Sequence, residues 1–253
     1  MFKRIIPSIL LNKSKVIKGE NFRNHKENGD AVSMVKIYNA QMADEILVLD
    51  IKLRNKGDKI NFELLKKISK NCFIPLCYGG GLDNENEVFK VLQSGFEKVF
   101  INNSAFKNTI FIKKLISIFG GQAIVVGVDY GYENQTPRVF INSGKKRTEE
   151  HPLEYIKELQ EIGVGEIILT NIDREGCRVG LDTNFIKFIS NNVAIPIIAS
   201  GGAGSLEDFV LPFKNSKLSG IAAGKMLLYS DNNLLKIRNY MKQNNINVRM
   251  NFD

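Results

Sequence analysis

The chain has 253 residues, of which 43% are hydrophobic and 25% are charged, with a formal net charge of +8. This length fits one large α/β domain or two small ones, and the composition is that of an ordinary soluble protein. No stretch approaches the ~18 apolar residues of a membrane span, and the N-terminus lacks a signal-peptide core, so we expect a cytoplasmic protein. The lysines are scattered over helical faces without interleaved aromatic residues, which argues against nucleic-acid binding.

Eight short apolar runs alternate with segments of helical periodicity. The candidate strands span residues 4–10, 45–51, 74–79, 98–102, 123–130, 166–172, 195–200 and 220–224. The candidate helices span residues 31–41, 61–70, 85–95, 109–120, 153–163, 184–192, 206–214 and 232–243. Eight βα units in about 250 residues predict one closed (β/α)8 TIM barrel over residues 1–253, with an open doubly wound sheet as the alternative.

The two halves of the chain repeat each other. Residues 74–102 align with 195–223 and residues 44–50 with 165–171, both at a shift of 121, while residues 4–10 align with 123–129 at a shift of 119. Two half-barrels of four βα units each explain this repeat. Asp129 ends the fifth strand, but its counterpart at the end of the first strand is Leu10, so the acid is present on one side only.

Glycine-rich loops follow the third and seventh strands, and short polar segments follow the fourth and eighth. Glycine lets the backbone approach an anion, and loops after strands seven and eight are a common phosphate site of barrels. The repeat therefore predicts two phosphate sites facing each other and a ligand with a phosphate at each end; simple tight turns are the alternative. The loop residues are Gly80, Gly81, Asn102, Asn103, Ser200, Gly201, Gly202, Ala223 and Gly224.

Polar side chains at strand ends are the candidates for chemistry. Asp129 is predicted to be catalytic or substrate-binding, with a loop cap as the alternative. Lys18 lies in a long loop predicted after the first strand, and Asp50 and Thr170 end the second and sixth strands. Residues 131–150 alternate like a small hairpin, which we expect to form a lid over the mouth of the barrel.

Charged residues also occur where strands begin. Arg4, Glu45, Lys98 and Glu166 start the first, second, fourth and sixth strands, at the floor of the predicted barrel. One interpretation is a ring of salt bridges that plugs the floor. The other is a gate for a small polar molecule that passes along the barrel axis.

The cysteines and histidines give no sign of a metal or cofactor. Cys72, Cys77 and Cys177 lack metal-binding spacing and are odd in number, so we expect reduced thiols. His25 and His151 lie far apart in sequence, and neither sits among other candidate ligands. We therefore expect neither a metal nor a cofactor.

Together these features resemble the cyclase subunit of imidazole glycerol phosphate synthase, an enzyme of histidine biosynthesis. The similarity covers nearly the whole chain and includes VIKGENF, DEILVLD, YGGG, KVFIN, GQAIVVGVD, SGKK, GEIILTNIDREG and IIASGGAG. It implies that a glutamine amidotransferase docks on the barrel floor near Glu97. It also implies that ammonia passes a gate of Arg4, Glu45, Lys98 and Glu166 to a bisphosphorylated substrate at the mouth.

The resemblance implies catalytic roles for Lys18 and Asp129, but the family's first catalytic aspartate falls on Leu10. Leucine cannot move a proton, and each general acid or base contributes about 10²- to 10⁴-fold to a rate. Asn103, Glu175 and Gly224 also differ from the usual family residues. The implied phosphate- or substrate-binding residues are Asp50, Gly80, Gly81, Asn102, Asn103, Thr170, Gly176, Ser200, Gly201, Gly202, Ala223 and Gly224.

Three functions fit this pattern. The loss of one acid is similar to a paralogous branch associated with bacterial surface sugars, in which the barrel and its amidotransferase supply ammonia to a separate ligase that makes an acetamidino group. The second function is a genuine cyclase in which another group replaces the lost acid. The third is a phosphate-binding scaffold that regulates the amidotransferase without catalysis.

Overall fold

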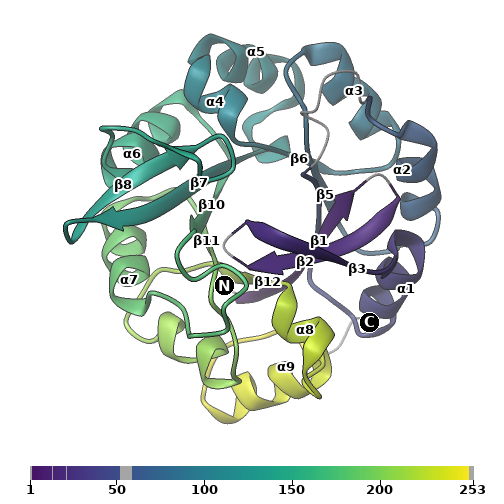
Figure 1. The fold of residues 1–253 in the computed structure, drawn as a ribbon, viewed down its shortest axis with the longest axis vertical. Coiled ribbons are helices and arrows are strands. Elements are labelled where there is room, and N and C mark those ends of the chain that lie inside the picture. Colours follow the sequence, from purple (N-terminus) through teal and green to yellow (C-terminus); the bar gives the residue numbers. More distant parts are fainter. Residues whose placement is uncertain (1, 13, 21, 52–58, 251–253) are drawn as a thin grey trace.

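A closed ring of eight parallel strands forms the centre of the molecule (Figure 1). The computed structural model describes residues 2–12, 14–20, 22–51 and 59–250. In ring order the strands are β1 (Arg4–Asn12), β4 (Ile46–Asp50), β5 (Leu76–Gly79), β6 (Lys98–Ile101), β7 (Ile124–Glu133), β10 (Glu166–Asn171), β11 (Ile197–Ser200) and β12 (Gly220–Ala223). Because β12 pairs in parallel with β1, the ring has no open edge. This confirms the predicted (β/α)8 barrel and excludes the open sheet.

Side chains alternate between the two faces of each strand and so build two cores. Outward residues such as Ile5, Val48 and Val126 pack under the helices. The inward residues form a smaller cluster, which we call the inner apolar layer. It comprises Ile6, Leu47, Cys77, Val125, Ile168, Ile198 and Ala222, with Leu49 and Phe100 packed against it. This layer separates the floor, at the strand N-termini, from the mouth, at the strand C-termini.

Helices cover the outside of the ring, and several begin at a polar capping residue. The side chains of Asp30, Asn61, Asn84, Asn108 and Asn233 each accept a hydrogen bond from the third residue of the following helix. The helices are α1 (Ala31–Ala40), α2 (Phe62–Ser69), α3 (Glu85–Gln93), α4 (Asn103–Lys107), α5 (Thr109–Phe119), α6 (Pro152–Ile162), α7 (Thr183–Asn192), α8 (Lys225–Tyr229) and α9 (Leu234–Gln243), with a 3₁₀ turn η1 (Gly121–Ala123). In the described part of the chain, no helix is long and apolar enough to cross a membrane.

The helix predicted over residues 206–214 does not form. This segment instead makes two 3₁₀ turns, η2 (Glu207–Phe209) and η3 (Leu211–Phe213). Pro212 has no backbone N–H to donate to an α-helical ladder, and its ring would clash with the preceding turn. Phe209 and Phe213 are nevertheless buried, so the apolar pattern was correct while the helical geometry was not.

An antiparallel hairpin extends from the mouth end of the first strand of each half-barrel. β2 (Lys15–Glu20) pairs with β1 and with β3 (Arg23–Asp30), so the long loop predicted after the first strand is wrong. β7 pairs with β8 (Thr136–Ile141), which pairs with β9 (Lys146–Arg147), as the alternating pattern of residues 131–150 predicted. The shared placement of the two hairpins agrees with the internal repeat.

The hairpin of β2 and β3 crosses the mouth. It starts at β1, and its tip touches a turn after β8, which extends from β7 across the ring, as well as the segment after the neighbouring strand β12. Phe22 lies against Gly144, in the turn after β8, and Glu20 forms an ion pair with Lys225, after β12. Figure 1 shows this hairpin over the centre of the barrel.

The second hairpin lies elsewhere. In Figure 1, β7 and β8 extend outward past α6. The hydroxyl of Tyr132 donates to Asp182, the residue that caps α7, at 2.6 Å, which ties the hairpin to the outer helices. The expectation that this hairpin covers the mouth is therefore wrong, although its turn at Gly144 meets the tip of the first hairpin.

Candidate functional site

Four charged side chains form a closed ring of ion pairs at the floor. Glu45 Oε2 accepts hydrogen bonds from Arg4 Nη1 at 3.1 Å and from Lys98 Nζ at 2.7 Å. Glu166 accepts from Lys98 Nζ at 3.1 Å and from both terminal nitrogens of Arg4. Each cation thus touches both carboxylates. The predicted salt-bridge ring exists, and its geometry alone fits both a plug and a gate.

The floor ring is charge-balanced and largely buried. The side chains of Glu45 and Glu166 are 4% and 7% exposed, against 26% for Arg4 and 21% for Lys98. Burial raises the pKa of Glu45. Burial lowers the pKa of Lys98 and of Arg4, but the two carboxylates outweigh this effect, so both pKa values are raised overall. Both cations therefore stay protonated at neutral pH.

β1 and β7 are the first strands of the two half-barrels. Of these two, only β7 presents an acid at the mouth. Asp129 is buried in β7, near the end of the part of this strand that pairs with β10, and its Oδ2 accepts a hydrogen bond from Asn102 Nδ2 at 3.0 Å. Thr170 pairs in register with Asp129 on one side and with Ser200 on the other. Leu10 lies at the matching end of β1, and the alternation from Arg4 directs it inward.

Lys18 comes from β2 and lies beneath the hairpin at the mouth. Its side chain is buried, and Nζ donates to the backbone oxygen of Ser8 at 2.6 Å. A Cβ at Gly224 would overlap this Nζ, so glycine leaves the room that the ammonium group occupies. Burial lowers the pKa of Lys18 to about 8, against the opposing charge of Glu175, and burial raises the pKa of Glu175. The structure therefore places a buried amine within electrostatic reach of a partly buried acid near the predicted phosphate loop.

The two glycine-rich loops have matching geometry. Gly80 and Gly201 both adopt positive φ, +136° and +92°, a region that favours glycine. A Cβ at Gly80 would clash with the carbonyl oxygen of Asp50, and a Cβ at Gly201 with that of Asn171. Asp50 and Asn171 are themselves partners in the repeat, so both halves bring a loop against the end of the neighbouring strand in the same way.

The other predicted binding residues lie at the same end of the barrel, but some are engaged within the protein. Asn103 Oδ1 accepts a hydrogen bond from the backbone N–H of Asn142 at 2.6 Å and so holds the turn after β8. A Cβ at Gly176 would overlap the carbonyl oxygen of Gly19 in the hairpin tip. Gly81 and Gly202 are the second residues after β5 and β11, and Ala223 is the last residue of β12.

Glu97 is exposed on the floor side, immediately before β6. Its Oε2 accepts a hydrogen bond from the backbone N–H of Leu76 at 2.7 Å, which fixes its side chain against the start of β5. Phe73 lies in the loop before β5 and is 89% exposed. The floor thus combines a fixed carboxylate with an exposed aromatic ring, close to the strands that carry the charged ring.

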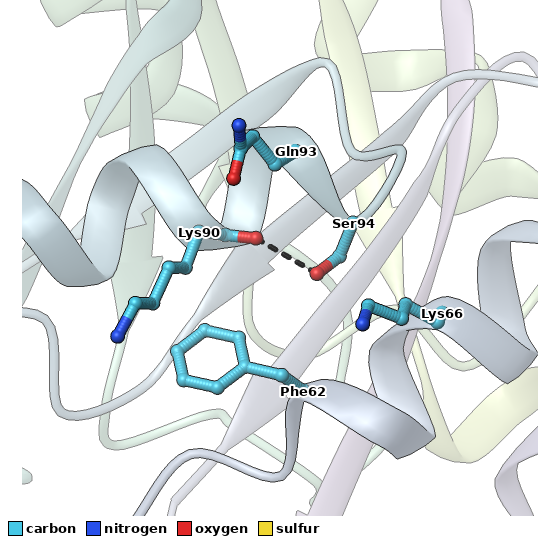
Figure 2. A pocket seen from close by; sticks show the side chains of 5 residues that line it. All are labelled: Phe62, Lys66, Lys90, Gln93 and Ser94. Atoms are coloured by element: carbon cyan, nitrogen blue, oxygen red, sulfur yellow. Dashed lines mark hydrogen bonds between the residues drawn. The ribbon is translucent and has the colours of Figure 1, made fainter.

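A separate groove of about 440 Å³ lies on the outside of the barrel, between α2 and α3 (Figure 2). Lys90 Nζ lies 5.8 Å from the centre of the Phe62 ring, and the Ser94 hydroxyl donates to the backbone oxygen of Lys90 at 2.7 Å. None of the predicted site residues lines this groove. The candidate site is therefore the barrel axis, from the floor ring to the mouth.

Comparison with known proteins agrees with this geometry. The sequence profile described as "histidine biosynthesis protein" matches residues 4–233. The chain belongs to this family. It is 36% identical over 250 residues to imidazole glycerol phosphate synthase subunit HisF of Clostridium botulinum, covering 98% of this chain and 99% of that protein. It is 37% identical over 249 residues to the HisF subunit of a Hydrogenobaculum species, with the same coverage.

A further relative is a Pseudomonas aeruginosa protein provisionally named imidazole glycerol phosphate synthase subunit hisF2. It is 33% identical over 251 residues, covering 97% of this chain and 98% of that protein. The chain is therefore a HisF-like barrel over essentially its full length.

Sequence reasoning missed two features of the site. The contacts that bury Lys18 depend on the hairpin of β2 and β3, whose second strand, RNHKENGD, has no apolar alternation to announce it. Phe100 also went unnoticed, although it lies between Lys98 and Asn102 in the inward register of β6. The spacing of two residues was the available signal, because side chains at that spacing share one face of a strand.

Proposed function

We propose that this chain is a synthase subunit that receives ammonia from a glutamine amidotransferase partner and conducts it through the barrel. The amide nitrogen would then serve amidino-group formation in surface-polysaccharide sugar biosynthesis, by a separate ligase. One contrast carries this proposal: all four charges of the floor ring are in place, whereas Leu10 stands where the family's first catalytic aspartate is expected.

The floor ring supports a gate because its contacts are unequal. Arg4 holds Glu166 through two nitrogens, a forked contact that is costly to break. Lys98 meets each carboxylate through one nitrogen on a flexible stem. Swinging Lys98 aside would open one sector of the ring while Arg4 still bridges both acids. A neutral ammonia molecule would then enter the barrel without an ion crossing its apolar layer.

The mouth supports delivery rather than ring closure. Cyclisation and cleavage at this position require proton transfer on two opposite sides of the substrate, as the resemblance implies. Asp129 can move a proton on one side, but Leu10 cannot do so on the other. A phosphorylated compound held by the two glycine loops would keep the upper end of the conduit closed to water.

The floor also supports a docking face for the amidotransferase. Phe73 is almost fully exposed at the same end of the barrel as the charged ring, and aromatic residues are enriched in protein interfaces. The hydrogen bond from Leu76 holds Glu97 in one position, which lowers the ordering cost of a contact there.

One observation favours a genuine cyclase as the second candidate. Glu175 is a partly buried acid that interacts electrostatically with Lys18, and desolvation raises its pKa, so it retains a proton more readily than an exposed glutamate. This pair could supply the proton transfer that Leu10 cannot. In that case the chain would convert the bisphosphorylated ribulosyl precursor and ammonia to imidazole glycerol phosphate and aminoimidazole carboxamide ribotide.

The proposal is tested by combining the purified barrel with its glutamine amidotransferase and glutamine labelled with ¹⁵N in the amide. We expect the barrel to stimulate glutamine hydrolysis at least 10-fold, with the label reaching the sugar acceptor when the ligase is added. The histidine precursor should not be consumed. Absence of both complex formation and stimulation would contradict the conduit, whereas rapid precursor turnover that is lost in Glu175→Gln would favour the second candidate.

A further inference from the structure

Phe100 places an aromatic ring inside the barrel, directly above the floor ring. It lies on β6, two residues after Lys98 and two before Asn102, so all three side chains face the barrel interior. Phe100 packs against the inner apolar layer, which otherwise contains aliphatic side chains and Cys77. It is the bulkiest side chain in this set.

The two neighbouring strands each carry a glycine against this ring. A Cβ at Gly79, on β5, would lie 2.6 Å from Phe100 Cδ1 and 2.8 Å from Leu49 Cδ2, and a Cβ at Gly127, on β7, would overlap Phe100 Cζ. Neither glycine has a positive φ, so neither is required by its backbone conformation. The two glycines instead make room for the ring, which spreads across three adjacent strands and meets Leu49 over Gly79.

The position above the ring is equally specific. A Cβ at Gly127 would also lie 3.0 Å from Asn102 Nδ2, the atom that donates to Asp129. The ring therefore lies directly below the Asn102–Asp129 pair. A molecule that rises along the barrel axis on the side of β5, β6 and β7 would pass Phe100 before it reaches the carboxylate at the mouth.

We propose that Phe100 is a second, apolar gate of the conduit, resting on the ammonia delivery proposed above. Its ring closes the axis between the charged floor and the mouth. An apolar constriction favours neutral ammonia over ammonium and hydroxide, because burying an unpaired ion in such a layer is costly. Rotation of this one aromatic side chain away from Gly79 and Gly127, whose missing side chains leave the room that the closed ring occupies, would open the passage.

Cys77 provides a reporter for this closure that needs no partner protein. Its thiol belongs to the inner apolar layer and is fully buried, whereas Cys72 and Cys177 are partly exposed. The isolated barrel would be treated with methyl methanethiosulfonate, and the modification rate of each cysteine would be followed by mass spectrometry. We expect Phe100→Ser to increase the rate at Cys77 at least 10-fold, with little change at the other two cysteines.

A matched control separates opening of the axis from loss of stability. Ile101 is the next residue of β6, is buried, and faces the outer core, so Ile101→Ala weakens packing without removing the ring. Phe100→Leu retains an apolar side chain in the layer. Both variants should leave Cys77 protected. Equal modification of Cys77 in wild type and Phe100→Ser, or in Ile101→Ala and Phe100→Ser, would overturn the gate.

This result is independent of the proposed function. If Cys77 becomes exposed in Phe100→Ser but the amidotransferase does not bind the barrel, Phe100 closes the axis in the wild-type chain. The proposed delivery of ammonia from this partner would then be wrong. Protection of Cys77 in Phe100→Ser together with efficient transfer of ¹⁵N would keep the conduit and remove Phe100 as its gate.

Discussion

The floor and the mouth of this barrel differ in how completely each site is built. At the floor, every charged group contacts two partners of opposite sign, and the ring closes on itself. At the mouth, the repeat preserves the backbone of two facing loops, yet Asp129 has only Leu10 as its counterpart. Under the proposed function, the floor retains what passage through the barrel needs, whereas the mouth lacks one of the two groups that paired proton transfer needs.

Charge reversal at the floor should have the largest effect on this contrast. Lys98→Glu would place a third carboxylate beside Glu45 and Glu166, with only Arg4 to balance them. We expect the amount of ¹⁵N delivered per glutamine hydrolysed to fall at least 10-fold, because the gate can no longer assemble. The measurement uses the reconstituted complex described above.

The matched variant at the mouth is Asp129→Asn, which retains the shape and the contact with Asn102. It should change ¹⁵N delivery less than twofold, because conduction does not require a proton acceptor there. Delivery that survives Lys98→Glu unchanged would show that the floor charges are structural. Delivery that is lost in Asp129→Asn would assign chemistry to the mouth.

Stability provides a second way to sharpen the comparison. Glu166→Gln leaves Arg4 and Lys98 to share the single charge of Glu45 in a mostly buried setting. We expect a loss of about 3 kcal/mol in the free energy of unfolding, since breaking a buried ion pair from one side typically costs this much. Urea denaturation would measure it. A loss below about 0.5 kcal/mol would mean that water, rather than Glu166, satisfies the two cations.

A pH series on Lys18 addresses the mouth. The folded-state pKa of about 8 lies below the unfolded value near 10.5, so burial of the charged amine opposes folding fully below pH 8. This penalty should fade as the pH rises from 8 to 10.5. The Lys18→Met variant lacks this penalty. The difference in the free energy of unfolding between the variant and wild type should therefore shrink by about 2 kcal/mol over this interval.

The Lys18 prediction is checked by chemical denaturation of both proteins at pH 7.5, 9 and 10. A constant difference between them across this range would show that Lys18 titrates as an exposed lysine. In that case the hairpin of β2 and β3 would not shield the mouth in solution.

The fold was predictable because its signals are periodic and occur twice. Eight apolar runs and the shift of about 121 residues determine the barrel and the positions of both glycine loops. The hairpin over the mouth was not predictable from RNHKENGD, since this strand gains its conformation from pairing with β2 rather than from its own apolar pattern. Residues 206–214 show the opposite case, in which a correct apolar pattern concealed the geometric effect of Pro212.

The candidate site, like the fold, was predictable only in part. The floor residues could be identified because each begins a strand, and strand starts in a closed barrel meet at one end. The contact between Asn103 and Asn142 could not be inferred, because it joins two loops whose relative position depends on the second hairpin. The role of Phe100 could not be predicted, because it depends on which face of β6 points inward and on the two glycines that lie beside the ring in space.

In the proposed function, this barrel conducts ammonia but lacks one of two proton-transfer groups. The most direct test is to supply the isolated barrel with ammonium and the bisphosphorylated histidine precursor, beside the Leu10→Asp variant, and to measure imidazole glycerol phosphate. We expect no product from the unmodified chain and a gain of at least 10²-fold from Leu10→Asp, consistent with the usual contribution of a general acid or base. Brisk product formation by the unmodified chain would contradict the account.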